Sequence, residues 1–240
     1  MKTGKLYLIP NTLGGETLGD IIPQEVINST IGIRFFAVEE VKSARRLLRK
    51  MDRTFPIDDS TFITLNKNTT VSDLRPLLQA LKNGDNVGII SEAGCAGIAD
   101  PGAILVAAAH EIGIQVCPMV GPSSILLTLI GSGFNGQQFS FHGYLPKDKK
   151  ERVRKLMELE QRVRRTGETQ IFMDTPFRNM HVLDDLLNEL KDDTLLCIAS
   201  NLTLLDESIK SMSIQDWREN AYDLGKRPTM FAIGHLDSAR

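Results

Sequence analysis

Short apolar runs rich in β-branched residues alternate with longer amphipathic segments along the first half of the chain. The short runs predict strands, and the longer segments, with apolar residues at helical spacing, predict helices. Strands that alternate with helices are typical of a parallel sheet built from βαβ units. The predicted strands are residues 5–9, 33–38, 62–65, 86–90 and 114–120, and the predicted helices are residues 39–51, 71–82, 104–112 and 125–130.

The pattern in the second half of the chain predicts a mixed sheet with helices. A charged helix is predicted at residues 147–166, because Val153, Leu156 and Val163 lie on one side at roughly helical spacing. The other predicted helices are residues 177–190 and 214–219, and the predicted strands are residues 170–173, 195–199, 209–212 and 230–233.

We therefore predict two α/β domains, residues 1–142 with a mostly parallel sheet and residues 143–240 with a mixed sheet, with residues 143–146 (GYLP) as the hinge. A length of 240 residues, with 42% hydrophobic and 24% charged, is sufficient for two globular cores. No apolar run approaches the ~20 residues of a membrane helix, and the N-terminus lacks the pattern of a secretory signal. We expect a cytoplasmic protein without membrane association.

The three cysteines, Cys95, Cys117 and Cys197, are odd in number and far apart. Their spacing fits neither a disulfide framework nor a zinc site, and it favours a reducing compartment. We expect no bound metal.

Two loops of the first domain are expected to lie at one edge of its sheet. Right-handed crossover brings residues 91–102 and 121–124 to the same edge, where open α/β sheets bind ligands. Gly94, Gly97 and Gly102 allow positive φ angles or close backbone approach. The carboxylate of Glu92, directly after a predicted strand, can accept hydrogen bonds from ribose hydroxyls or face a cationic centre.

The second of these loops, residues 121–124 (GPSS), leads into an apolar helix. Ser123 or Ser124 can cap that helix, and its free amides can face a carboxylate, an adenine edge or a phosphate. The last possibility keeps open a phosphate-handling hydrolase or transferase. The glycines of residues 11–20 fit neither a dinucleotide fingerprint nor a P-loop, and a serine hydrolase would need a glycine in place of Ile125.

The ordered motifs of the chain resemble the tetrapyrrole methylase superfamily of S-adenosylmethionine-dependent methyltransferases. The motifs are LYLIP at 6–10, SEAG at 91–94, ADPG at 99–102, GPSS at 121–124, FHGYLP at 141–146 and FMDTPFR at 172–178. Within the superfamily they look most like the branch that contains the small-subunit ribosomal RNA 2′-O-methyltransferases. The resemblance spans roughly residues 5–235.

This resemblance implies a cofactor, S-adenosyl-L-methionine, in a ligand cleft between the two domains, a homodimeric assembly and ribosomal RNA as substrate. Methylation of a tetrapyrrole or corrin precursor, and a cofactor-binding protein without catalysis, remain alternatives. The cofactor contacts that it implies are Leu13, Glu92, Gly94, Cys95, Ala96, Ser123, Ser124, Ile125, Met173, Asn201 and Thr229.

The segment after the second predicted strand departs from the ribosomal pattern. Glu39 matches it, whereas the next three residues do not, and we take Glu39 as the candidate catalytic group on the acceptor side. The candidate substrate contacts in this segment are Glu40, Lys42, Arg45 and Arg46. The loop at 93–97 (AGCAG) also lacks the Thr-Pro pair common in the superfamily.

Two basic stretches stand out against a formal net charge of −2. One covers residues 42–53 and the other residues 147–165, each on a predicted helix. Such stretches are either solvated helix faces or contacts to phosphates, because a local patch rather than the total charge sets the affinity for nucleic acid.

Overall fold

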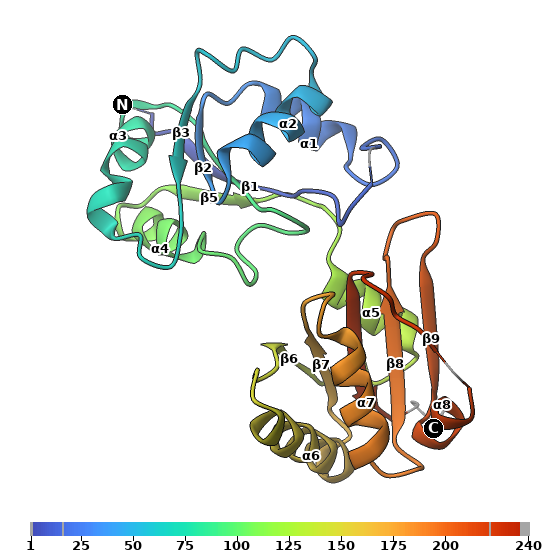
Figure 1. The fold of residues 1–240 in the computed structure, drawn as a ribbon. Helices are drawn as coiled ribbons and strands as arrows, with labels where there is room; N and C mark the ends of the chain where they lie inside the picture. The colour runs from blue at the N-terminus through green and yellow to red at the C-terminus, as the bar shows by residue number, and fades with distance from the viewer. Residues whose placement is uncertain (1, 16, 221, 236–240) are drawn as a thin grey trace. The chain divides into compact units, whose positions relative to one another are not determined.

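The computed structural model describes residues 2–15, 17–220 and 222–235. The chain divides into two compact units, Met1–Ser123 and Ser124–Arg240 (Figure 1). The predicted boundary lay after residue 142, whereas the structure places residues 124–142 in the second unit. They belong there because the helix and the strand that they contain pack with the second sheet.

The first unit contains a fully parallel sheet with the order β3-β2-β4-β1-β5. All five strands coincide with predicted ones, which confirms the parallel sheet. Pro118 is tolerated because β5 lies at the sheet edge. The bounds are β1 Lys5–Ile9, β2 Phe35–Val38, β3 Thr61–Thr64, β4 Val87–Ile90 and β5 Gln115–Pro118.

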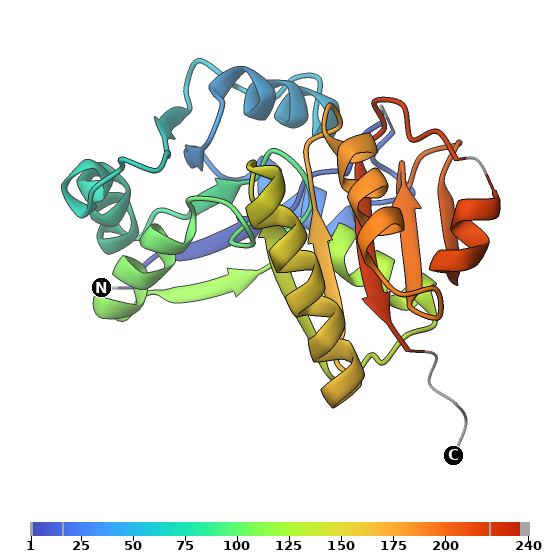
Figure 2. The ribbon, with the colours of Figure 1, turned by 60° about the horizontal axis from the view of Figure 1, so that its bottom comes forward.

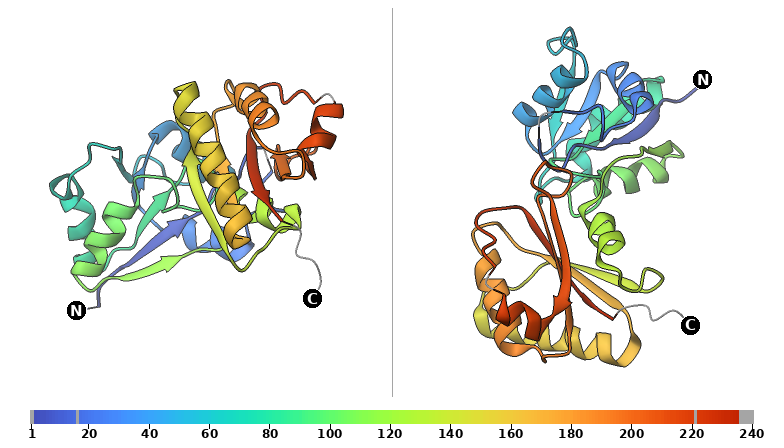
Figure 3. Two further views of the ribbon diagram at one scale, coloured as in Figure 1. Left: turned by 90° about the horizontal axis from the view of Figure 1, so that it is seen from below. Right: turned by 90° about the vertical axis from the view of Figure 1, so that its right-hand side faces the viewer.

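Helices cover both faces of the first sheet (Figures 1 and 3). On one face lie α1 (Gln24–Ile31) and α2 (Val41–Met51), and on the other α3 (Arg75–Asn83), preceded by a 3₁₀ turn, η1 (Val71–Leu74), and α4 (Ala103–Glu111). The helix α1 was not predicted; it begins after Pro23 without a side-chain cap.

A glycine in the central strand permits close packing beneath α1 and α2. A Cβ added at Gly88 would lie 2.4 Å from Ile9 Cδ1 and 3.2 Å from the Phe36 ring. Phe36, which is fully buried, also stacks on Phe62 with ring centroids 5.4 Å apart. The glycine therefore allows large side chains of neighbouring strands to fill this layer.

The second unit contains a mixed sheet, as predicted, and its strand order is β6-β7-β10-β8-β9. Only β6 and β7 pair in parallel, and the other neighbours are antiparallel. The sequence analysis missed β6, and the predicted hinge begins at Gly143, inside that strand. The bounds are β6 Phe139–Tyr144, β7 Thr169–Met173, β8 Leu195–Ser200, β9 Ser208–Ser213 and β10 Thr229–Gly234.

Helices also cover both faces of the second sheet (Figure 2). One face carries α6 (Lys149–Thr166), α7 (Asn179–Glu189) and α8 (Ile214–Glu219), which bury a core around Trp217. The other face carries α5 (Ser124–Ser132), whose Gly131 is close to Ile209. This packing explains why α5 belongs to the second unit.

Candidate functional site

The segments that follow the neighbouring strands β1 and β4 lie on opposite faces of the first sheet. The chain after β1 enters α1, whereas the chain after β4 enters α4 on the other face. Such a reversal opens a crevice at the carboxyl ends of the two strands, where α/β sheets bind ligands. The structure thus places the candidate site at the carboxyl ends of these strands, the position that the sequence predicted.

Asn11 joins the loops that follow these two strands. Its backbone N–H donates to Gly94 O at 2.9 Å, and Gly94 N–H donates to Asn11 O at 3.2 Å. Its side-chain amide donates to Ser91 O at 3.2 Å and to Glu92 O at 3.0 Å. Asn11 was not predicted, although a polar residue just after a strand of the predicted βαβ unit was the available signal.

The loop at residues 91–102 is held in a defined shape by its own polar groups. Ser91 Oγ donates to Gly94 O at 2.7 Å, and the Asp100 carboxylate accepts from the N–H groups of Gly97 and Gly102 at 2.7 and 2.8 Å. Gly94 has φ +70°, and an added Cβ would lie 3.2 Å from Leu13 Cδ2. A side chain there would therefore strain the turn and push Leu13 away.

Cys95 and Ala96 turn inward from this loop. The Cys95 thiol donates to Pro122 O at 3.4 Å and to Gly121 O at 3.6 Å, and burial raises its pKa. Ala96 is buried. A thiol held protonated is a poor nucleophile, so Cys95 contributes packing and a tie to the loop at 121–122 rather than covalent chemistry.

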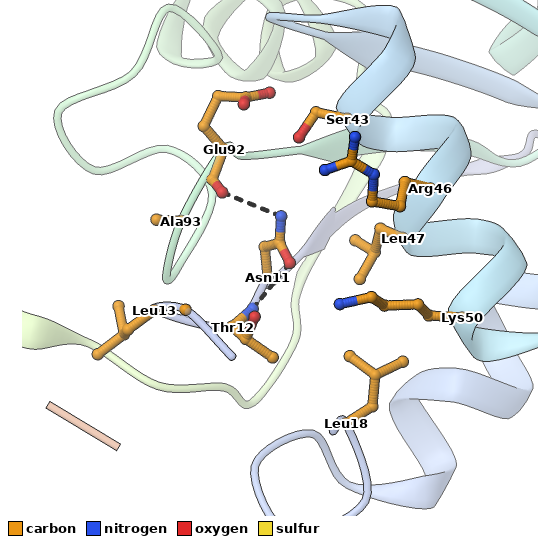
Figure 4. A pocket seen from close by; sticks show the side chains of 11 residues that line it. Asn11, Thr12, Leu13, Leu18, Ser43, Arg46, Leu47, Lys50, Glu92 and Ala93 are labelled. Carbon is orange, nitrogen blue, oxygen red and sulfur yellow. Dashed lines mark hydrogen bonds between the residues drawn. The ribbon is translucent and has the colours of Figure 1, made fainter. Parts of the chain in front are cut away.

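A pocket of about 190 Å³ lies between these loops and α2 (Figure 4). Two predicted cofactor contacts, Leu13 and Glu92, line it together with one predicted substrate contact, Arg46. Lys50 was not predicted individually but also lines it. The remaining lining residues are Asn11, Thr12, Gly14, Leu18, Ser43, Leu47 and Ala93.

Glu39 and Glu40 have different roles at the start of α2. Glu40 is the N-cap, and its carboxylate accepts from the N–H groups of Lys42 and Ser43 at 2.8 and 2.6 Å. Glu39 lies at the end of β2, where burial, followed by the negative charges of Asp100 and Glu92, raises its pKa. The structure thus brings Glu39 to the site and occupies the carboxylate of Glu40 in holding the helix.

The other two predicted substrate contacts lie outside the pocket lining. Lys42 is exposed, and Arg45 Nη2 lies 3.6 Å from Asp58 Oδ1 in an exposed ion pair. Ser123, the last residue of the first unit, is buried, while Ser124 and Ile125 open α5 in the second unit.

Three predicted cofactor contacts meet at one edge of the second sheet. Met173 ends β7, Asn201 directly follows β8, and Thr229 opens the antiparallel β10 between these strands. Thr229 Oγ1 and Ser200 Oγ are 2.9 Å apart, and Asn201 N–H donates to Pro228 O at 3.0 Å. The antiparallel register therefore gathers residues that lie far apart in the sequence.

Two polar residues that the sequence analysis did not single out lie in the segment after β7. Asp174 pairs with Arg178 through Oδ1, and Asn179 donates to Arg227 O at 2.9 Å. Asp174 Oδ2 and Asn179 Oδ1 are buried, and neither accepts a hydrogen bond from the described residues. Within residues 2–15, 17–220 and 222–235, no group of three or more His, Cys, Asp or Glu side chains is arranged to hold a metal ion.

None of the described helices is both long and apolar enough to span a membrane. The fold matches a two-unit α/β architecture seen in a solved methyltransferase. The crystal structure of the methyltransferase CobJ superposes with a TM-score of 0.61 over 99% of this chain and 97% of that chain, at 17% sequence identity. The chain therefore belongs to the α/β fold class of this methyltransferase.

Curated relatives identify the family within that class. Ribosomal RNA small subunit methyltransferase I of Vibrio cholerae is 31% identical, over 88% of this chain and 69% of the relative. Its counterpart in Synechocystis is 32% identical, over 88% and 72%. The Bacillus subtilis protein is 30% identical, over 83% and 64%. No protein-family model matches the chain. The chain belongs to the ribosomal RNA small subunit methyltransferase I family, and it is a methyltransferase.

Proposed function

We propose that this protein transfers a methyl group from S-adenosyl-L-methionine to a ribose 2′-hydroxyl of small-subunit ribosomal RNA. The observation that carries the proposal is the family relationship, which covers 88% of the chain. The pocket adds support, because predicted cofactor and predicted substrate residues line it together.

The first unit offers groups that suit the cofactor. The Glu92 carboxylate accepts no hydrogen bond from the described residues, so it is available to ribose hydroxyls or to a sulfonium. Gly94, Cys95 and Ala96 present backbone at a turn held by Asn11. We expect Leu13 to pack against the same ligand. Ser123, Ser124, Ile125, Met173, Asn201 and Thr229 remain predicted contacts.

The cofactor supplies an already electrophilic methyl group, so the task of the protein is alignment. We expect the residues around the pocket to hold the acceptor oxygen in line at ~3–3.5 Å from the reacting carbon. Glu39 is the candidate to accept the hydroxyl proton. Its raised pKa makes it a stronger base than an ordinary glutamate, which favours proton transfer near neutral pH.

A tetrapyrrole or corrin acceptor has weaker support. The likeness to CobJ at 17% identity shows the fold alone. No observation on the described residues favours a phosphate-handling hydrolase over a methyltransferase.

The cofactor is tested by calorimetric titration of the purified protein with S-adenosylhomocysteine. We expect micromolar binding, and a Glu92→Ala variant should lose most of it. Binding of nucleoside triphosphates alone would contradict the proposal. Gly94→Ala provides a second check, because strain at φ +70° should weaken binding without removing any side-chain contact.

The acceptor is tested by deleting the gene in its host and mapping ribose methylation across the ribosomal RNA. We expect the loss of one 2′-O-methyl mark, restored by the wild-type gene but not by Glu92→Ala or Ser124→Trp. An unchanged map, together with methylation of a tetrapyrrole in vitro, would overturn the proposed substrate.

The proposal includes a homodimer that acts in the cytoplasm, where a ribosomal substrate is found. The support for the dimer is the superfamily resemblance. Light scattering at micromolar concentration should give twice the chain mass of 26.6 kDa, and a value equal to one chain would refute it.

A further inference from the structure

Two cationic side chains of α2 point into the pocket at the edge of the first sheet. Arg46 and Lys50 lie one helical turn apart; in Figure 4 Lys50 points towards the loop after β1, and the guanidinium of Arg46 lies nearer to Ser43 and Glu92. Lys50 Nζ donates to Gly15 O at 3.3 Å. Among the described residues, no carboxylate lies within 4.0 Å of the charged nitrogens of either side chain. Two like charges at this spacing repel, and a negatively charged ligand between them would relieve that repulsion.

The surroundings of these cations favour a small anion. Leu13, Leu18 and Leu47 line the pocket with apolar side chains beside the exposed Arg46 and Lys50. The side-chain N–H groups of Asn11 donate to backbone carbonyls and are therefore not free to bind an anion. The volume of about 190 Å³ is below the ~300–1,000 Å³ of pockets that enclose a whole ligand, so this pocket takes one group of a larger molecule.

Among the described lining residues Glu92 carries the one negative charge, and it does not neutralise the pair. Glu92 lies at the opposite end of the pocket from Lys50 in Figure 4. Two cations against one carboxylate leave an excess positive charge beside Lys50. An anion is therefore attracted to the end formed by Lys50, Arg46 and the loop after β1.

We propose that Arg46 and Lys50 bind the backbone phosphate that adjoins the methylated ribose, an inference that rests on the proposed function. In RNA this phosphate is attached to the 3′ oxygen, next to the 2′ oxygen that receives the methyl group. A 2′-O-methyltransferase therefore needs an anion subsite beside its reacting centre. The pocket joins these cations to Leu13 and Glu92, which are the predicted cofactor contacts. The carboxylate of the cofactor is also an anion that two cations can bind, and the experiment distinguishes it from the RNA phosphate.

The test uses small ribosomal subunits purified from the gene-deletion host, which lack the mark. The variant Arg46→Gln/Lys50→Gln is compared with the wild type and with Lys82→Gln, which removes an exposed cation on α3 outside the pocket. Binding and methyl transfer are measured between 50 and 200 mM salt, roughly the range over which phosphate contacts weaken. Thermal melts first establish that each variant is folded, and Lys50→Gln alone replaces the double variant if it is not.

We expect the double variant to bind subunits at least tenfold more weakly at low salt. Its plot of log affinity against log salt should be shallower by about 0.7 to 1 for each phosphate that the variant no longer neutralises. Arg46→Lys should retain most of the salt dependence, and Lys82→Gln should match the wild type. Affinity for S-adenosylhomocysteine should be unchanged in all four proteins.

Two results would overturn the inference. One is an unchanged salt slope in the double variant, and the other is a tenfold loss of S-adenosylhomocysteine affinity, which would assign the cations to the carboxylate of the cofactor. Failure of the proposed function looks different, because the wild-type protein itself would then transfer no methyl group to these subunits.

Discussion

Two basic helices, α2 and α6, look alike in sequence and differ in the structure. Three of the five arginines of α6 pair with acidic residues of the same unit. Arg152 is buried, and its Nε and Nη2 both lie 2.7 Å from Asp185 Oδ2. Arg162 pairs with Glu168 at 2.6 Å, and Arg164 pairs with Asp193. These pairs lie within the second unit, and the buried one joins α6 to α7.

The charges of α2 remain available. Its one ion pair among the described residues is the exposed contact between Arg45 and Asp58. The helix is held instead by the Glu40 cap and by the buried apolar residues Ala44, Leu47 and Leu48. A basic stretch in a sequence is thus a candidate ligand surface only when no acidic partner is folded against it.

The largest expected effect is the loss of the buried pair in α6. Arg152→Ala leaves the Asp185 carboxylate buried, with only Lys149 Nζ near it at 3.7 Å. We expect a loss of about 3–5 kcal/mol in the free energy of unfolding, measured by urea denaturation. The control Arg154→Ala, an exposed residue of the same helix, should change stability by less than about 0.5 kcal/mol. Equal effects for the two variants would refute the structural role of Arg152.

The cap of α2 should matter less. Glu40→Ala removes the acceptor for two backbone N–H groups and should cost about 0.5–2 kcal/mol. Glu40→Asp keeps a carboxylate at the cap and should recover part of that loss in the same assay. If Glu40→Ala is as stable as the wild type, α2 is not anchored in this way.

Neutralising the pocket cations should leave stability nearly unchanged. In Arg46→Gln/Lys50→Gln the relief of like-charge repulsion should add about 0.2–0.5 kcal/mol, because no ion pair of the described residues is broken. Urea denaturation beside the Arg152 variant measures this contrast directly. A loss of more than about 1 kcal/mol would show that these cations stabilise the fold, against the ordinary range for surface changes.

The smallest effect is expected at the partly buried Glu39. Its raised pKa means that the folded state disfavours the charged form, so its stability contribution is present at low pH and lost as pH rises through the folded pKa. Glu39→Gln should therefore melt slightly higher than the wild type at pH 7. The difference should vanish below the ordinary pKa of 4.5, and a difference that is constant with pH would contradict this explanation.

The sequence alone predicts most of the helices and strands and the sheet edge that carries the candidate site. Strand and helix patterns repeat over two to four residues, so local spacing predicted all five strands of the parallel sheet and seven of the helices. The glycines and Glu92, which follow β4, predicted the candidate ligand loop from the same kind of local pattern. The helix α1 and the edge strand β6 were not predicted, because α1 begins after Pro23 without a side-chain cap and the register of β6 shifts between Phe141 and Tyr144.

The contacts between residues that are distant in the sequence are visible only in the folded structure. Asn11 and Glu92 are 81 positions apart, Lys50 and Gly15 are 35 apart, and Arg152 and Asp185 are 33 apart. Such contacts depend on strand order and on the burial of whole helix faces, which sum over many residues rather than over a local pattern. For that reason the sequence showed two similar basic helices, and only the fold distinguished the helix whose charges are paired from the helix whose charges face a pocket.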